Sequence, residues 1–251
     1  MSDYALQLSD AEIARYRFMA EAAARDEREA WTAAGVTEGA RVADVGCGPG
    51  AVSAALAGIV GPSGTVYAID SDPHAVALGR RAAREAGVSN VVFAEGAATA
   101  TGWSPESVDV VMLRHVLAHN GGQEQAIVDH LATLVRPGGC VYLVDVDLTA
   151  MRIRPPEAAT GIADLADRYA EFHARLGNDL SVGLRLGELL SQAGLEQVNH
   201  RGRYQILRPP AGMRPPAWAA RDQMLAAGVI DDADIDRWQA EFEELGICQP
   251  V

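Results

Sequence analysis

The 251-residue chain is 49% hydrophobic and 22% charged, which predicts one α/β domain over residues 1–251. No apolar run reaches about 18 residues and no basic segment followed by an apolar one opens the chain, so we expect a cytoplasmic protein with no membrane contact. The net charge of −13 repels phosphate backbones and argues against nucleic acid as a partner.

The basic residues and the cysteines exclude several kinds of catalytic and metal site. All 21 basic residues are arginine, which excludes the lysine of a phosphate-binding P-loop, Schiff-base chemistry and the Tyr-x-x-x-Lys pair of short-chain dehydrogenases. Cys47, Cys140 and Cys248 fit no zinc-binding spacing. We therefore expect neither a metal site nor a disulfide. Abundant Arg and Ala without Lys also suggests a bacterial source.

The chain opens with a helical pattern over residues 9–34, in which Ser9 and Glu12 form a predicted capping box. Strands and helices then alternate. The predicted strands cover residues 41–45, 65–70, 91–94, 108–113 and 140–146, and the predicted helices cover 52–60, 75–86 and 123–135. This alternation indicates a parallel sheet with right-handed crossovers.

The remaining sequence indicates helices at 162–176, 184–193, 217–227 and 232–245, with a sixth strand at 195–207. Only a stub, residues 246–251, is left for a seventh strand. Three explanations are open: the last strand is short, a partner supplies the edge, or the chain is cut. An unpaired sixth strand would be an exposed edge, which leads to the hypothesis of a homodimer.

A glycine-rich loop, Gly46-Cys47-Gly48-Pro49-Gly50, follows the first predicted strand. Such a loop lets a ligand approach the backbone and a helix N-terminus, although alone it can be a simple tight turn. Its spacing is not the Gly-x-Gly-x-x-Gly of dinucleotide enzymes. Asp44, two residues before it, suits a cationic amino-acid group better than a pyrophosphate. Asp70 ends the second strand and could accept both ribose hydroxyls, or could simply belong to a turn.

Residues 41–147 resemble class I S-adenosylmethionine-dependent methyltransferases of the UbiE-like, type 11 group. Four segments match the motifs of that family in order: residues 42–50, 66–70, 107–117 and 134–139. The resemblance implies a Rossmann-like, doubly wound, mostly parallel seven-stranded sheet with added N-terminal and C-terminal helices. Its parts would be a helical cover at 1–39, a cofactor-binding core at 40–147, and an acceptor-pocket segment with the C-terminal helices at 148–251.

The resemblance also implies residue roles. The methionine part and sugar of the cofactor would be surrounded by Asp44, Gly46, Cys47, Gly48 and Gly50. The ribose would be held by Asp70 and Ser71, the adenine would contact Ala97 and Ala98, and the methionine moiety would lie beside the Arg114 backbone. Family members often carry Asp or Asn where this chain has Ala97, so we expect one weaker adenine contact.

Two histidines after the fourth strand, His115 and His119, are candidate general bases. They are four residues apart and would share one face of a helix, although a structural role is the commoner outcome for such residues. No carboxylate completes a metal site. Candidates for the acceptor pocket are Tyr16, Phe18, His173 and Asn178, with packing as the alternative for the first two.

We therefore predict transfer of a methyl group from S-adenosylmethionine to a small-molecule acceptor, a bacterial metabolite or natural product, by in-line displacement. The product of the cofactor would be S-adenosylhomocysteine. The alternatives are a protein or RNA methyltransferase, a non-catalytic S-adenosylmethionine-binding domain and a nicotinamide oxidoreductase. The loop spacing and the absence of lysine argue against the last of these.

Overall fold

The computed structural model describes residues 10–150, 160–203 and 214–244. Within them, five strands form one parallel sheet in the order β3-β2-β1-β4-β5. The strands are β1 (Arg41–Val45), β2 (Thr65–Asp70), β3 (Val91–Glu95), β4 (Val108–Arg114) and β5 (Val135–Val144). The order turns back at β1, and in open α/β sheets ligands bind beyond the carboxyl ends of the strands at such a point.

Helices cover both faces of the sheet, so the strands are apolar on both sides. On one face, Val42 and Val110 pack against α1 (Asp10–Asp26), α2 (Arg28–Ala33) and α3 (Ala51–Val60), beside α4 (Pro73–Glu85). On the other face, Val45 and Leu113 pack against α5 (Glu124–Leu134) and α7 (Leu186–Gln192). Alternation along each strand thus divides the core into two layers.

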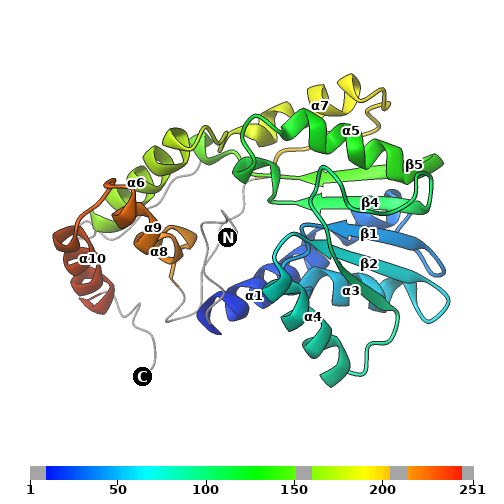
Figure 1. Cartoon of the computed structure of the whole chain (residues 1–251), viewed down its shortest axis with the longest axis horizontal. Coiled ribbons are helices and arrows are strands. Elements are labelled where there is room, and N and C mark those ends of the chain that lie inside the picture. Colours follow the sequence, from blue (N-terminus) through cyan, green and yellow to red (C-terminus); the bar gives the residue numbers. More distant parts are fainter. Residues whose placement is uncertain (1–9, 151–159, 204–213, 245–251) are drawn as a thin grey trace.

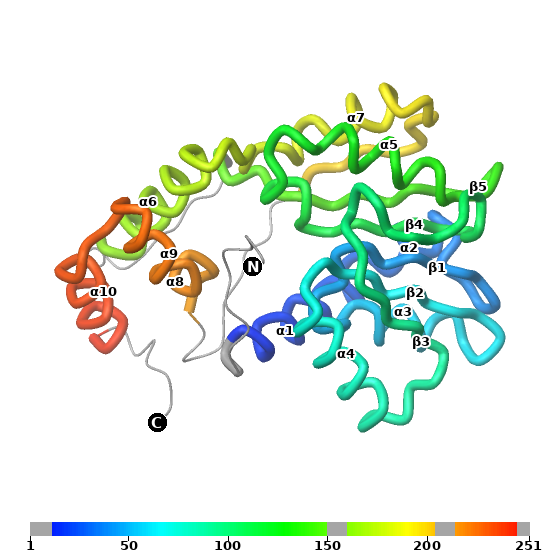
Figure 2. Tube along the Cα trace, viewed as in Figure 1, coloured from blue at the N-terminus to red at the C-terminus, as the bar shows by residue number. Residues whose placement is uncertain are grey.

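A lobe of helices stands beside the carboxyl ends of the strands (Figure 1). It contains α6 (Gly161–Arg175), α8 (Pro216–Ala219), α9 (Arg221–Ala226) and α10 (Asp232–Glu244) around an apolar cluster of their own. Figure 2 shows that the chain leaves the sheet after β5, forms α6, returns to the core as α7 and ends in the lobe. Three short 3-10 helices complete the described elements: η1 (Leu117–His119), η2 (Leu148–Ala150) and η3 (Val182–Arg185).

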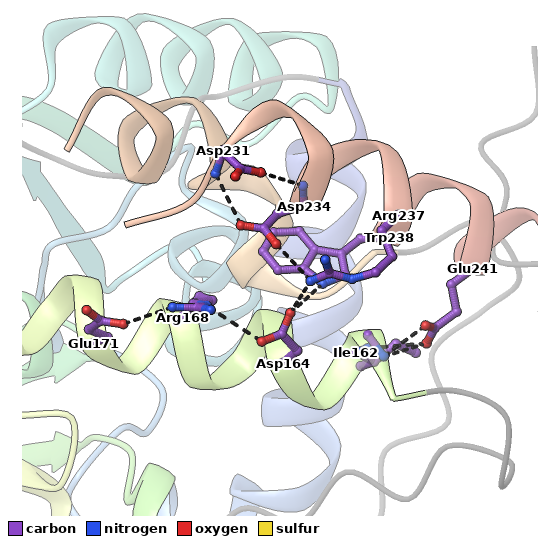
Figure 3. A network of polar contacts seen from close by, with 10 residues as sticks. Ile162, Asp164, Arg168, Glu171, Asp231, Asp234, Arg237, Trp238 and Glu241 are labelled. Carbon is purple, nitrogen blue, oxygen red and sulfur yellow. Dashed lines mark hydrogen bonds and ion pairs between the residues drawn. The ribbon is translucent and has the colours of Figure 1, made fainter. Parts of the chain in front are cut away.

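Hydrogen bonds and ion pairs connect α10 to α6 (Figure 3). The Glu241 carboxylate accepts hydrogen bonds from the Gly161 N–H at 2.8 Å and from the Ile162 N–H at 3.3 Å, and so caps the first turn of α6. Arg237 and Trp238 both donate to the Asp164 carboxylate, at 2.5 and 3.2 Å. These contacts fix the direction in which α6 runs from the lobe toward the sheet.

The prediction of seven strands is wrong for the described residues, which contain five. The described part of the predicted sixth strand, residues 195–203, forms no strand, and Val198 in it is 90% exposed. A strand needs a neighbouring strand and a face to bury. Residues 195–203 pair with none of the described strands, and nearly all of them are exposed. The rest of that prediction, residues 204–207, and the stub 246–251 lie outside the described residues.

Two boundaries also differ from those predicted. Strand β5 begins at Val135, because Val108 pairs with Val135 and Val110 with Cys140, and the Pro-Gly-Gly turn is an irregularity between these pairs. The N-terminal helix is two helices that meet at Glu27. Ser9, the predicted capping residue, lies outside the described residues, and the Glu12 carboxylate pairs with Arg15 at 2.6 Å.

Candidate active site

The loop after β1 requires glycine at two positions. Gly46 and Gly50 have φ angles of 71° and 76°, a left-handed conformation that other residues rarely adopt. A Cβ atom on Gly46 would collide with Val116, and one on Gly50 would lie 2.7 Å from the Phe93 ring. The loop is therefore packed tightly between the elements around it, and side chains at these two positions would not fit.

Hydrogen bonds join this loop to the end of β2. The N–H groups of Gly46 and Cys47 both donate to the Ile69 carbonyl, at 2.7 and 3.0 Å. The Gly48 N–H donates to Asp70 Oδ2 at 2.7 Å, and Asp70 Oδ1 accepts from the Asp72 N–H at 2.9 Å. Burial raises the pKa of the Asp70 carboxyl. The carboxylate is thus held in place and still has lone pairs for a ligand.

Asp44 lies under the same loop. Its side chain is 3% exposed and accepts a hydrogen bond from Ser53 Oγ at 2.6 Å. Burial raises the pKa of this carboxyl to about 6, against which the Ser53 hydroxyl lowers it. Neutralisation by a cationic ligand would relieve the cost of burying the charge.

The end of β3, just before the residues predicted to contact adenine, borders Asp70. The Gly96 N–H donates to the Asp70 carbonyl at 2.9 Å. Ala97 is exposed and Ala98 half-buried, and the exposed Ser71 follows Asp70 directly. The structure therefore brings together, at one edge, the predicted residues from the ends of three strands.

Arg114, at the end of β4, pairs its side chain with Glu27 of the helical cover. Its Nη2 donates to Glu27 Oε1 at 2.6 Å, and only 10% and 12% of the two side chains are exposed. Glu27 Oε2 accepts from Tyr142 Oη of β5 and from Trp31 Nε1 of α2. Glu27 is not recognisable from the sequence, because its sequence context is that of an ordinary helix carboxylate.

His115 and His119 do not share a helix face, so that prediction is wrong. His115 has a φ angle of 57°, and its N–H donates to the Val144 carbonyl at 2.8 Å. His119 follows in η1. Burial lowers the pKa of His115 to about 3 and that of His119 to about 4, with Arg15 acting in the same direction on both. The left-handed residue turns the chain before the 3-10 helix begins, so the two histidines do not lie on one helix.

Asp145 holds this turn and was also missed. It directly follows β5, and its Oδ2 accepts from the N–H groups of Leu117 and Ala118 at 2.9 and 3.3 Å. Burial raises the pKa of the Asp145 carboxyl to about 6, opposed by these backbone donors. A carboxylate at the carboxyl end of a predicted strand was the available signal.

The far side of the site comes from the end of α6. His173 is 1% exposed, and its ring lies 4.9 Å from that of His119 and 4.3 Å from that of Tyr169. Asn178 contacts His173 Nδ1 at 2.9 Å through its Nδ2. The predicted pair His173 and Asn178 is therefore in contact, and it lies against one of the two predicted histidines of the core.

Helix α1 borders both parts of the site. The Tyr16 ring lies beside Gly48, where an added Cβ atom would be 3.4 Å from it. Phe18 is half-buried on the same helix. Arg15, which the sequence analysis did not select, lies near enough to His115, His119 and Tyr169 to affect the pKa of each.

The described residues also bear on metal binding and on membrane insertion. They contain no group of three or more His, Cys, Asp or Glu side chains placed to hold a metal ion. Their helices are all too short or too polar to cross a bilayer.

Known proteins resemble this chain in sequence and in fold. A family model described as a methyltransferase domain matches residues 36–181. A probable cobalt-precorrin-6B C(15)-methyltransferase (decarboxylating) of Sulfolobus acidocaldarius is 36% identical over 107 residues, which are 42% of this chain and 53% of that protein. The ubiquinone/menaquinone biosynthesis C-methyltransferase UbiE of Shewanella piezotolerans is 28% identical over 183 residues, 66% of this chain and 70% of that protein.

The fold is that of a SAM-dependent methyltransferase from Aquifex aeolicus, with a TM-score of 0.52 and 21% identity. That similarity covers 67% of this chain and 79% of the other. Among the curated relatives, several matches span only about half the length of the relative. The region matched by the family model extends from the start of the sheet to the end of the His173–Asn178 segment.

Proposed function

Because the chain belongs to the methyltransferase-domain family, we propose that it is an enzyme that moves the methyl group of S-adenosylmethionine to a small-molecule acceptor. One observation carries this proposal: two sets of residues lie at the carboxyl edge of the sheet. Asp44, Asp70 and the glycine loop form the first set, and His119 faces His173 in the second. A cofactor and an acceptor would meet between them.

The first set fits S-adenosylmethionine, the cofactor of this family. The loop leaves no room for side chains at Gly46 and Gly50, Asp44 is a buried carboxylate suited to a cation, and Asp70 is a fixed acceptor for hydroxyls. When bound, the cofactor supplies an electrophilic methyl group on a sulfonium sulfur. We assign its contacts to Asp44, Gly46, Cys47, Gly48, Gly50, Asp70, Ser71, Ala97, Ala98 and the backbone of Arg114.

The second set suits a small acceptor. Tyr169, His173 and His119 present rings rather than a charged surface, and the chain carries a net charge of −13, which disfavours a polyanionic substrate. The relatives named for cobalt-precorrin and for ubiquinone and menaquinone biosynthesis act on small molecules. We therefore favour a bacterial metabolite over RNA or protein, with Tyr16 and Phe18 closing the site from α1.

His115 and His119 are the groups we propose to receive a proton where the acceptor must lose one. Their pKa values of about 3 and about 4 keep them neutral at pH 7, so each can accept a proton, although weakly. The rest of the catalysis is alignment of the acceptor with the methyl group and exclusion of water. His115→Ala and His119→Ala should lower kcat if this role is correct, and unchanged rates across pH would rule it out.

The proposed function is tested by incubating the protein with methyl-labelled S-adenosylmethionine and separate pools of quinols, phenols, tetrapyrroles, amines, tRNA and protein. We expect label in one or more small-molecule pools and none in tRNA or protein. Asp70→Ala is the matched negative control, because it removes the proposed ribose acceptor without touching the second set of residues. Label in tRNA or protein would favour the macromolecule alternative, and S-adenosylmethionine binding without any transfer would favour a binding domain.

A further inference from the structure

The His173 side chain contains a buried polar atom that has no role in the proposed reaction as described above. The ring is 1% exposed and is surrounded by the rings of Tyr169, Phe172 and His119. Its Nε2 atom is buried and makes no hydrogen bond within the described part of the chain. Buried polar atoms are rarely left without a partner, and such an atom beside an active site indicates a place for a ligand.

The contacts of Asn178 decide which nitrogen of His173 carries the proton. The Gly121 N–H lies 3.0 Å from one end of the Asn178 amide, and because an N–H only donates, that end is Oδ1. The other end, Nδ2, is therefore the atom 2.9 Å from His173 Nδ1. An amide nitrogen also only donates, so Nδ1 is the unprotonated acceptor and the neutral ring carries its proton on Nε2.

The backbone around Gly121 makes this arrangement rigid. A Cβ atom on Gly121 would collide with the Gly177 carbonyl, so the loop after η1 and the segment after α6 are in direct contact. The Asn178 N–H also donates to the His173 carbonyl at 3.0 Å. The orientation of the imidazole is thus determined by the contact between the sheet core and the end of α6.

We infer that Asn178 is a positioning residue that holds His173 as the Nε2–H tautomer, and that this N–H donates a hydrogen bond to an acceptor-only oxygen of the methyl acceptor. This inference rests on the proposed function and names its substrate class. The acceptor is a carbonyl compound or its enolate, or a phenolate, rather than a protonated amine or another cation.

The charges around the ring agree with this choice. Burial, followed by the neighbouring His119, lowers the pKa of His173 to about 4, so the ring is neutral at pH 7 and offers a single donor. His119 has a lowered pKa for the same reason, with a contribution from Arg15 of α1. No carboxylate among the described residues hydrogen-bonds the His173 ring, so within them the buried Nε2–H has no competing acceptor.

Asn178→Asp reverses the polarity of His173 with little change in shape. Its carboxylate still accepts from the Gly121 N–H, but it presents an acceptor to Nδ1, so the proton of the neutral ring moves to Nδ1 and Nε2 becomes an acceptor. Asn199→Asp adds the same charge on the exposed surface and is the matched control.

The tautomer is measured first, by two-bond ¹H–¹⁵N correlation of His173 in the protein loaded with S-adenosylhomocysteine at about pH 8.5, where imidazole is neutral. The wild type and Asn199→Asp should show a protonated Nε2, and Asn178→Asp a protonated Nδ1. A protonated Nδ1 in the wild type would overturn the inference, whether or not the variant folds.

The oxygen preference is then measured by titrating the same samples with acetophenone, whose ketone oxygen only accepts, and with 1-phenylethylamine, which has the same skeleton and a donor cation. Acetophenone should shift the His173 Nε2–H resonance of the wild type, bind about tenfold more weakly to Asn178→Asp, and displace the amine as the preferred ligand only in the wild type. No shift with acetophenone, or the same preference in both proteins, would overturn the inference.

These outcomes separate the inference from the proposed function. A protein that shows the predicted tautomer and ketone preference but transfers no labelled methyl group contradicts the enzyme and supports the oxygen-binding site. A protein that methylates amines alone and shows no response to acetophenone supports the enzyme and contradicts the site.

Discussion

At the scale of single residues, burial rather than charge pairing sets the protonation of the site. Desolvation raises the pKa of Asp44 and Asp145 and lowers the pKa of His115, His119 and His173. The carboxylates are therefore more ready to take up a proton and the histidines less ready. The site presents neutral imidazoles at pH 7 beside a carboxylate that a cation would keep ionised.

Asp44 should make cofactor affinity depend on pH. Its carboxyl has a raised pKa of about 6, and the ionised form is the one that attracts the cationic methionine part. The attraction is present above pH 6 and is lost as the pH falls through that value, so S-adenosylmethionine should bind up to about tenfold more weakly at pH 5 than at pH 7.5.

Calorimetric titration at the two pH values measures this effect. Asp44→Asn is the matched variant, because it keeps the Ser53 contact and cannot ionise; it should bind weakly at both values. A wild-type affinity that stays constant between them would show that Asp44 does not contact the cofactor.

The protein should be more stable with glycine than with alanine at position 115. Its φ of 57° costs a residue with a Cβ about 1 kcal/mol, and glycine escapes this cost. His115→Ala should therefore unfold at lower urea concentration than His115→Gly, by about 1 kcal/mol. The same pair of substitutions at His119, in η1, should show the opposite order, because glycine weakens helical backbone. Equal stability of the two His115 variants would contradict the left-handed turn.

At the scale of elements, the local sequence pattern predicted the helices and strands that local sequence determines. Strands β1 to β4 and helices α3 to α6 lie within a few residues of the predicted ranges, because alternating apolar residues and glycine turns specify them. The start of β5 could not be found this way, since Val135 joins the sheet by pairing with Val108 across a Pro-Gly-Gly irregularity. Residues 195–203 have strand-like residues but no partner strand in the structure.

Site residues that belong to a sequence motif could be predicted. Site residues whose roles depend on contacts with other elements could not. The loop at Gly46–Gly50, Asp70 and Asp44 could be identified from spacing along the chain. Glu27 and Arg15 could not be identified, because their roles depend on partners from other elements. Asp145 was missed although its place at the carboxyl end of a predicted strand was a signal. His173 and Asn178 were selected by segment alone, and only the fold showed that they touch.

The Glu27–Arg114 pair should be the strongest single link between the helical cover and the sheet. Both side chains are nearly buried, and Glu27 also accepts from Trp31 and Tyr142. Glu27→Ala leaves a buried guanidinium without its partner and should lower the free energy of unfolding by about 3 kcal/mol.

Urea unfolding measures this loss, and Glu85→Ala is the control. It breaks a pair with Arg81 in which 72% and 63% of the side chains are exposed, and it should cost less than about 1 kcal/mol. Similar costs for the two variants would contradict a structural role for Glu27.

At the scale of the whole molecule, a sheet core proposed to bind the cofactor meets a helical lobe that carries the proposed acceptor residues. Helix α6 connects the two, with its start capped by Glu241 and its end beside His119. Glu241→Ala should weaken the lobe by about 1 kcal/mol, because two N–H groups of the first turn lose their acceptor.

Hydrogen exchange localises this effect. Amides of the first turns of α6 should exchange faster in Glu241→Ala, while those of β1 and β4 stay as in the wild type. The exposed Glu244→Ala on the same helix is the control. Uniformly faster exchange would mean that the lobe and the sheet unfold as one unit.

The central claim, that the loop of residues 46–50 and Asp70 hold S-adenosylmethionine, is tested most directly by calorimetric titration with S-adenosylhomocysteine and with NADH. The structure predicts one S-adenosylhomocysteine bound per chain, no binding of NADH, and at least about tenfold weaker binding of S-adenosylhomocysteine to Asp70→Ala. Binding of NADH alone, or unchanged affinity in Asp70→Ala, would contradict it.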